Sequence, residues 1–341
     1  MPPVPPMQPP FNPYRPKLFP FDDLPEDLAR LIIEEAVADP DAPEWSFACV
    51  SKAVRGWVEP ILYRRVVLKT PLALYSFQRT LNSHPSKRAD FFATSVKSFW
   101  IGDPKLLDLT IVFDILSTCS GVTALSWCNF VEAGDRRLSP FIVVRHAIWE
   151  TLRLKRLSIA TALFAETHRH FSFAAHWGPG KTRNPVFRGI THLDLSTSRR
   201  QLDPRWSCGT LSCLKALTHL CFSSTGLDRE YKNYIHHNLE MVRPHFPPSL
   251  IVCVFSIPYE TFNDTHRYIP KYVCEIDPRV VIAIAEHCYR RELERSFQVE
   301  AGWVEKETIW RRGGEIAQKD KEAFWERAVA LVHRRKEGLK G

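Results

Sequence analysis

The sequence predicts a mixed α/β chain: a short helical module, an irregular solenoid of strand–helix units, and a C-terminal helical cap. Two observations predict this fold. Apolar residues recur at helical spacing near the N-terminus, and beyond residue 90 a shorter apolar pattern recurs six times. A single strand–helix unit cannot bury its apolar face alone, so the repeated units are expected to stack into one continuous core.

Composition bounds the class of protein. Of 341 residues, 45% are hydrophobic and 25% charged, which is ordinary for a folded globular chain. The net charge of +8 would indicate nucleic acid only if the cations clustered, and along the sequence they do not. The longest clearly apolar run, residues 280–285, is too short to cross a bilayer. We therefore expect neither a nucleic-acid nor a membrane partner, and a cytoplasmic and/or nuclear location.

The cysteines and the N-terminus fit this location. Nine cysteines form no Cys-x-x-Cys pair, which favours buried free thiols in a reducing compartment. Residues 1–20 hold nine prolines and lack the apolar core of a signal peptide. They are expected to form a disordered, polyproline-prone tail. Its Pro-x-x-Pro spacings would suit an SH3-type domain, and a simple solvated tail is the alternative.

Residues 21–68 are expected to form the helical module. Pro25 suits the first position of a helix, since its missing N–H would have no partner there. One apolar stripe follows, and a third helix is expected to be kinked or shortened by Pro60. The stripe of the first helix contains Leu28, Leu31, Ile32 and Ala36; that of the third contains Val54, Trp57, Val58 and Leu62. Val66–Leu68 is expected to be a short strand that leads out of the module.

Three segments of this module resemble the F-box-like motif common in fungal proteins: Leu24-Pro25-x-x-Leu28-x-x-x-Ile32, Val50-Ser51-Lys52, and Leu62-Tyr63-Arg64-Arg65-Val66-Val67-Leu68. The resemblance implies a three-helix module that binds the Skp adaptor of cullin-based ubiquitin ligases. The adaptor-binding residues that it implies are Leu24, Pro25, Leu28, Ile32 and Val50. Val54 stands where the family often has Trp, and Trp57 is expected to replace it one helical turn later. The competing interpretation is that these residues only form a three-helix core.

The repeat places apolar residues at positions 1, 4 and 6 of a short segment. Its six copies start at Val96, Val122, Leu154, Ile190, Leu217 and Leu250, with spacings of 26, 32, 36, 27 and 33 residues. Positions 4 and 6 share one face of a strand and are expected to bury against the following helix. Such helices are expected at 108–119, 162–173 and 228–242.

This array resembles degenerate leucine-rich repeats, although the Asn or Cys that follows the last apolar position in that family is absent. We expect the solenoid to span residues 69–288, with a last strand near Val280. Residues 289–341 are expected to form a C-terminal helical segment. In it a helix at 321–335, with Phe324, Ala328, Leu331 and Val332 on one side, would cap the open end of the array.

The order of the two parts resembles that of fungal F-box proteins with leucine-rich tails. This resemblance implies a substrate adaptor that is not an enzyme. Such an adaptor would bind the Skp adaptor and cullin scaffold through one part and an unknown client protein through the other. The candidate client-binding residues on the expected concave face are Trp100, Arg156, His192, Asp194 and His219. His192 and His219 are expected side by side, about 4.8 Å apart. Ordinary surface residues of a strand are the alternative interpretation for these side chains.

The sequence admits two alternative functions. A ligase-independent interaction scaffold is the first alternative to the adaptor. An enzyme is the second, but the sequence has no nucleophile elbow, P-loop or dinucleotide fingerprint. The densest histidine cluster, His168, His170 and His176, lacks the spacing of a zinc protease. We therefore expect no catalytic residues, no metal and no cofactor.

Overall fold

The structure is a computed structural model that describes residues 24–38, 44–83, 87–102, 108–127, 146–160, 185–197, 208–224, 239–258, 276–286, 302–306 and 318–338. The chain divides into two compact units, residues 1–62 and 63–341. Together they contain helices and one parallel sheet, which confirms the mixed α/β class. No helix of the described ranges is long and apolar enough to span a membrane. The Pro-rich tail lies outside the described residues.

The described part of the first unit contains three helices: α1 (Glu26–Ala38), α2 (Glu44–Phe47) and α3 (Lys52–Leu62). Two acidic residues, Glu26 and Asp27, lie in the first turn of α1, where they oppose the positive end of the helix dipole. α3 continues past Pro60 to its end at Leu62. A small apolar core holds the three helices together; its buried members are Val37, Ala48, Val54, Val58 and Leu62.

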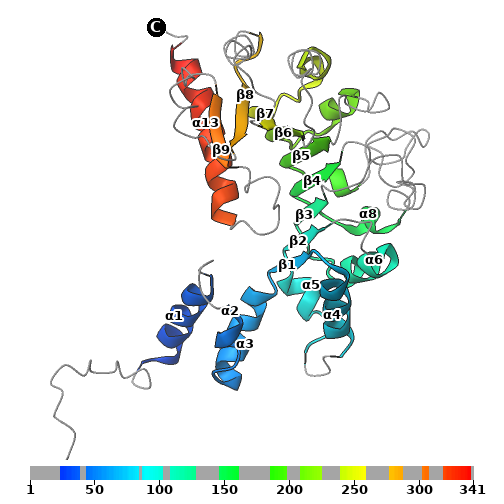
Figure 1. Cartoon of the computed structure of the whole chain (residues 1–341), viewed down its shortest axis with the longest axis vertical. Helices are drawn as coiled ribbons and strands as arrows, with labels where there is room; N and C mark the ends of the chain where they lie inside the picture. Colours follow the sequence, from blue (N-terminus) through cyan, green and yellow to red (C-terminus); the bar gives the residue numbers. More distant parts are fainter. Residues whose placement is uncertain are drawn as a thin grey trace, which may run out of the picture. The chain divides into compact units, whose positions relative to one another are not determined.

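The described residues of the second unit form a sheet of nine parallel strands, whose order in the sheet follows their order in the chain (Figure 1). The strands are β1 (Arg65–Leu68), β2 (Ser98–Ile101), β3 (Ala124–Trp127), β4 (Arg156–Ala160), β5 (His192–Thr197), β6 (His219–Ser224), β7 (Val252–Pro258), β8 (Val280–Glu286) and β9 (Gly302–Lys306). The described helices of this unit are α4 (Pro71–Asn82), α5 (Phe91–Ser95), α6 (Leu109–Thr118), α8 (Ile148–Thr151), η4 (Pro185–Phe187), η5 (Cys208–Cys213), η6 (Arg243–His245) and α13 (Gln318–Gly338).

The first face of the sheet packs against the connecting helices, and the repeat register is confirmed there. Leu125, Leu157, Leu193 and Leu220, all at position 4, are aligned partners on β3–β6. Position 6 forms a second row: Trp127, Ile159, Leu195, Phe222 and Phe255. All of these residues are at most 2% exposed and belong to one core with residues of α4, α6 and α8.

Hydrogen bonds at the amino ends of the strands form a ladder. In each of the five steps from β2 to β7, two successive N–H groups donate to one carbonyl of the preceding unit; Thr191 and His192, for example, both donate to Lys155 O. The hydroxyl of Thr191 donates to the same oxygen at 3.1 Å, and the hydroxyl of Thr218 to Thr191 O at 3.0 Å. This ladder connects successive repeats in which the Asn or Cys of leucine-rich repeats is missing.

Three expectations about the ends of the sheet need correction. The strand expected to lead out of the helical module is β1, which pairs with β2 and belongs to the second unit. β9 was not expected, and it pairs with β8 beyond the predicted last strand. The C-terminal helix α13 therefore does not cap the array; it lies on the second face of the sheet, opposite the helices α4, α6 and α8 (Figure 1).

The packing of α13 has a clear physical cause. Its predicted stripe, Phe324, Ala328, Leu331 and Val332, is confirmed as buried, at 3% exposure or less. This stripe covers the apolar second face of β6–β8, formed by Cys221, Val252, Val254, Val281 and Ala283. A parallel sheet that is apolar on both faces must be shielded from water on both, and α13 shields the second face here. The helix expected at 108–119 is present as α6, whereas 162–173 and most of 228–242 lie outside the described residues.

The repeat register makes a stability prediction. Leu193→Ala and Leu220→Ala should each lower the free energy of unfolding by roughly 2–5 kcal/mol, because each leaves a cavity in a fully buried row. Thr191→Ala and Thr218→Ala remove one ladder hydrogen bond each and should cost only about 1 kcal/mol. Urea denaturation followed by tryptophan fluorescence measures all four. Equal losses at the leucines and threonines would contradict the register.

Candidate functional site

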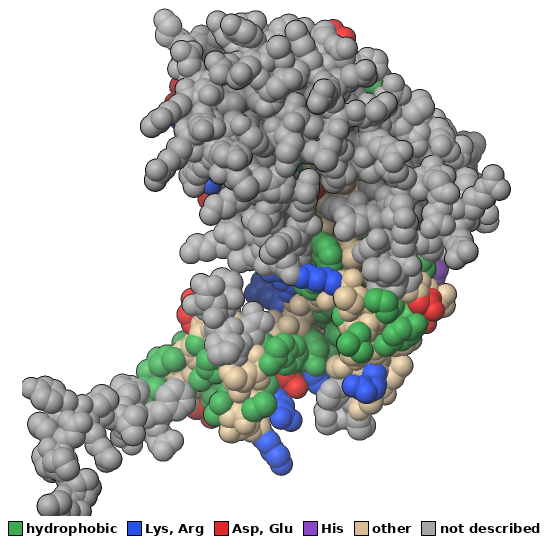
Figure 2. All heavy atoms as spheres, viewed as in Figure 1, with side chains coloured by type: hydrophobic (Ala, Val, Ile, Leu, Met, Phe, Trp, Pro, Cys, Tyr) green, Lys and Arg blue, Asp and Glu red, His purple; other side chains and the backbone are tan. Residues whose placement is uncertain are grey.

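The first candidate site is an apolar surface of the helical unit. Leu28 and Ile32 lie one turn apart on α1 and are 49% and 50% exposed. Pro25 precedes the helix, and its carbonyl accepts the N–H of Leu28 and of Ala29. Val50, in the turn between α2 and α3, is 66% exposed, while Leu24 is half-buried. Hydrophobic side chains gather on the surface over α1 and α3 (Figure 2).

A different side of α1 faces the core of the unit. Ala29 and Val37 are buried, and Ile33 packs against the cluster that Val37 forms with α3. Leu28, Leu31 and Ile32 are thus apolar residues that the small core does not use. Their exposure argues against the interpretation in which this stripe only holds the three helices together. Val54, at the position where the F-box-like family often has Trp, is buried in the core, and Trp57 packs against it half-buried.

The second candidate site is the second face of the sheet, where strand pairing aligns side chains into two rows. One row contains Arg65, Ser98, Ala124, Arg156, His192, His219 and Val252. The next row contains Val67, Trp100, Ser126, Ser158, Asp194, Cys221, Val254 and Val281. All five predicted client-binding residues lie in these rows. Cys221 and Val254, in the second of these rows, are fully buried beneath α13.

Asp194 joins three neighbouring strands. Its carboxylate accepts hydrogen bonds from Ser158 of β4 at 2.7 Å and from Ser223 of β6 at 2.9 Å. Both serines lie on the second face, so this carboxylate has a structural role across β4–β6 in addition to any contact with a partner. The repeat pattern predicted the strand and the face of Asp194 but did not predict these two hydrogen bonds.

His192 and His219 form a stacked pair, as their register predicts. Their ring centroids are 4.2 Å apart and their planes differ by 4°. The ring of Trp325, on α13, meets both rings edge-on at 5.5 and 5.1 Å. The pair is therefore half-buried under the helix, which corrects the expectation that both histidines are exposed.

Neighbouring threonines orient the two rings. Thr191 Oγ1 lies 2.9 Å from His192 Nδ1, and Thr218 Oγ1 lies 2.7 Å from His219 Nδ1. Each hydroxyl donates its single hydrogen to a ladder carbonyl, so its oxygen can accept a hydrogen bond from the ring N–H. This arrangement favours the neutral tautomer that carries its hydrogen on Nδ1.

The environment also favours neutral rings. Burial, the neighbouring His219 and the charge of Arg156 lower the pKa of His192 to about 3. Burial and Arg156 lower the pKa of His219 to about 4. Both imidazoles are therefore uncharged at neutral pH, and a stacked neutral pair can serve as an apolar platform for Trp325.

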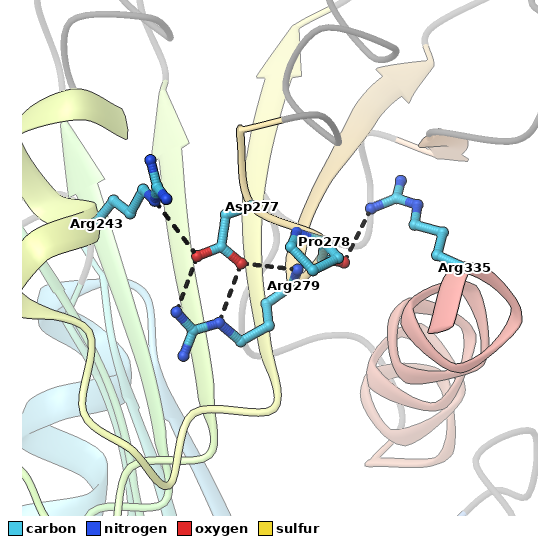
Figure 3. A network of polar contacts seen from close by, with 5 residues as sticks. All are labelled: Arg243, Asp277, Pro278, Arg279 and Arg335. Carbon is cyan, nitrogen blue, oxygen red and sulfur yellow. Dashed lines mark hydrogen bonds and ion pairs between the residues drawn. The ribbon is translucent and has the colours of Figure 1, made fainter. Parts of the chain in front are cut away.

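A buried ionic network stabilises the turn that leads into β8, beside α13 (Figure 3). Asp277, 5% exposed, accepts two hydrogen bonds from the Arg279 guanidinium at 2.8 and 3.0 Å, and Arg243 lies 3.9 Å away. Burial raises the pKa of Asp277, but the bonds and charge of Arg279 outweigh it, so the pKa lies below its usual value. Arg335 of α13 donates to the carbonyls of Pro278 and Val280, at 3.3 and 2.5 Å, and so ties the helix to the start of β8.

The structure also gathers cations that look scattered in the sequence. Arg64 precedes β1 and Arg65 starts it, Lys97 precedes β2, and Lys155 precedes β4, which Arg156 starts. The first two groups are about one repeat length apart along the chain and the last two about two repeats apart, and register places all of them at the amino ends of β1, β2 and β4. Alignment of the repeats at positions 2 and 3 was the sequence signal that could have revealed this row.

Among the described residues, no group of three or more histidine, cysteine, aspartate or glutamate side chains is placed to hold a metal ion. Comparison of the chain with protein-family models, with curated proteins and with solved structures gives no match. The chemistry of the described surfaces is therefore the basis for any assignment of function.

The histidine pair makes a prediction about pH. Its pKa values lie below the ordinary 6.5, so between pH 6.5 and about 4 the unfolded chain binds more protons than the folded one. Stability should therefore fall as the pH drops through this window. His192→Gln with His219→Gln should flatten that part of the profile, whereas His333→Gln, an exposed histidine on α13, should leave it unchanged. Chemical denaturation at each pH measures the three proteins; identical profiles would contradict the assignment.

Proposed function

We propose that the protein is a substrate-recognition adaptor of a Skp-cullin-F-box ubiquitin ligase. In this proposal the helical unit is an F-box-like domain, and the second unit is a leucine-rich-repeat-like solenoid that binds a client protein. The protein contributes proximity: it holds the client near the ubiquitin-transfer machinery and performs no chemistry itself.

The observation that carries the proposal is the apolar surface of α1. Leu28, Leu31 and Ile32 are between 49% and 60% exposed, and the core of the unit uses other residues. Contiguous apolar surface on a soluble module indicates a protein-binding site. Leu28 and Ile32, with Leu24 and Pro25, also match the positions at which F-box-like proteins contact the Skp adaptor. Chemistry and sequence resemblance thus support the same partner.

The second unit supports the other half of the proposal. Nine parallel strands in chain order, each aligned with the next, are typical of a solenoid, and the buried rows at positions 4 and 6 fit leucine-rich repeats. Repeat proteins use the face opposite their helices to bind other proteins. In this chain α13 takes part of that face, and the remaining rows contain Trp100 and Arg156.

The docking prediction is tested on α1. Leu28→Asp with Ile32→Asp should abolish co-purification with the Skp adaptor, because two carboxylates would lose their water in an apolar interface at a cost of several kcal/mol. The fold should survive, since both side chains are about half exposed. Arg79→Asp on α4 changes the net charge by the same amount and should leave docking intact. Undiminished adaptor binding by the double variant would remove the basis of the proposal and leave the ligase-independent scaffold.

A further inference from the structure

The second face of the sheet changes character from β1 to β8. Its β6–β8 part is apolar and packs against α13, and the described contacts of α13 on β5 and β6 include the ring of Trp325 on the histidine pair. On β1–β4 the same face carries Arg65, Trp100 and Arg156. A client that used this sheet face would therefore meet a cationic surface with one large aromatic side chain.

The cations form one coherent group. Arg64 and Lys155 are exposed, while Arg65, Lys97 and Arg156 are half-buried. Lys69 follows β1 directly and is exposed as well. Strands β1–β4 themselves contain no aspartate or glutamate. Six positive charges at or next to the ends of β1, β2 and β4, two of them in the row itself, create a local positive potential, whatever polar contacts the individual side chains make.

The row has a definite size. Arg65 and Arg156 belong to one row and are three strand spacings apart, which is roughly 14 Å. Between them lie only the small side chains of Ser98 and Ala124. Trp100 stands two residues further along β2, beside this row. Roughly 14 Å is the length of four or five residues of extended peptide.

We infer that this cationic row, with Trp100, binds an acidic segment of a partner protein that also carries a large apolar or aromatic side chain. The inference rests on the proposed function, since it names the chemical class of the client. Glutamate or aspartate side chains would meet Arg65 and Arg156, and the apolar side chain would pack on Trp100; Trp and Arg are the residue types most often found at binding hot spots. Nucleic acid is the less suitable partner, because tight binding there commonly uses 6–10 phosphate contacts over a longer track.

Fluorescence anisotropy of the full chain tests this with a labelled peptide in which glutamates flank a central phenylalanine. Binding should weaken as salt increases, and Arg65→Glu with Arg156→Glu should weaken it by about tenfold or more. Lys97→Glu with Lys155→Glu, at the positions just before the row residues Ser98 and Arg156, should also weaken peptide binding. This second variant replaces the first if the first disturbs the fold. Trp100→Ala should reduce the affinity for this peptide but barely that for one with alanine in place of phenylalanine.

Matched controls locate the effect. Arg79→Glu with Lys215→Glu changes the net charge equally at exposed positions away from the row, and should leave the affinity unchanged. Equal losses in this control pair and the row variants, or no binding of the peptide by the wild type, would overturn the inference. Preference for a single-stranded oligonucleotide over the peptide would overturn it as well. Co-purification with the Skp adaptor, measured on the same proteins, reports the proposed function separately, because it depends on α1.

Discussion

The second unit depends on the hydrogen-bond ladder at the amino ends of its strands. Along β2–β7, one carbonyl in each unit accepts two successive N–H groups of the next, and threonine hydroxyls such as those of Thr191 and Thr218 reinforce it. Because side chains alternate along a strand, a shift of one residue would move every buried leucine to the opposite face. The ladder prevents that shift, so the apolar rows meet the helices and the remaining rows form the second face.

Register also explains why the second face has two parts. Among the side chains that alternate with the buried leucines, those on β1–β5 include the polar or charged Arg65, Arg156 and Asp194. On β6–β8 most of them are apolar, and Cys221, Val252 and Val254 are fully buried. The apolar part needs a second cover, and the stripe of α13 provides it. Arg335 donates a hydrogen bond to the carbonyl of Val280 at the start of β8, next to the turn that Asp277 and Arg279 stabilise. The proposed client-binding surface is the part of the second face, on β1–β4, that α13 does not cover.

Periodicity predicted well what depends on local pattern. Positions 4 and 6 of the repeats, the stripe of α13 and the stacked histidines all follow from alternation and spacing, and the structure agrees. The sequence could not reveal where α13 docks, because Phe324 and Leu331 would suit any apolar surface. Only the alignment of β6–β8 shows which apolar surface lacks another cover. For the same reason the cations at Lys97 and Lys155 looked dispersed, since their proximity comes from pairing across repeats rather than from the chain.

Arg156 links the two parts of the second face. Its charge is among the causes that lower the pKa values of His192 and His219, so the pair remains neutral and accepts the ring of Trp325. A protonated pair would place two further cations beside Arg156, and their mutual repulsion would disfavour the packing of Trp325 there. The positive charges of the row end at β4, and its next two positions are the neutral histidines against which Trp325 packs. One arginine thus contributes charge to the proposed client surface and also helps to keep the neighbouring surface closed.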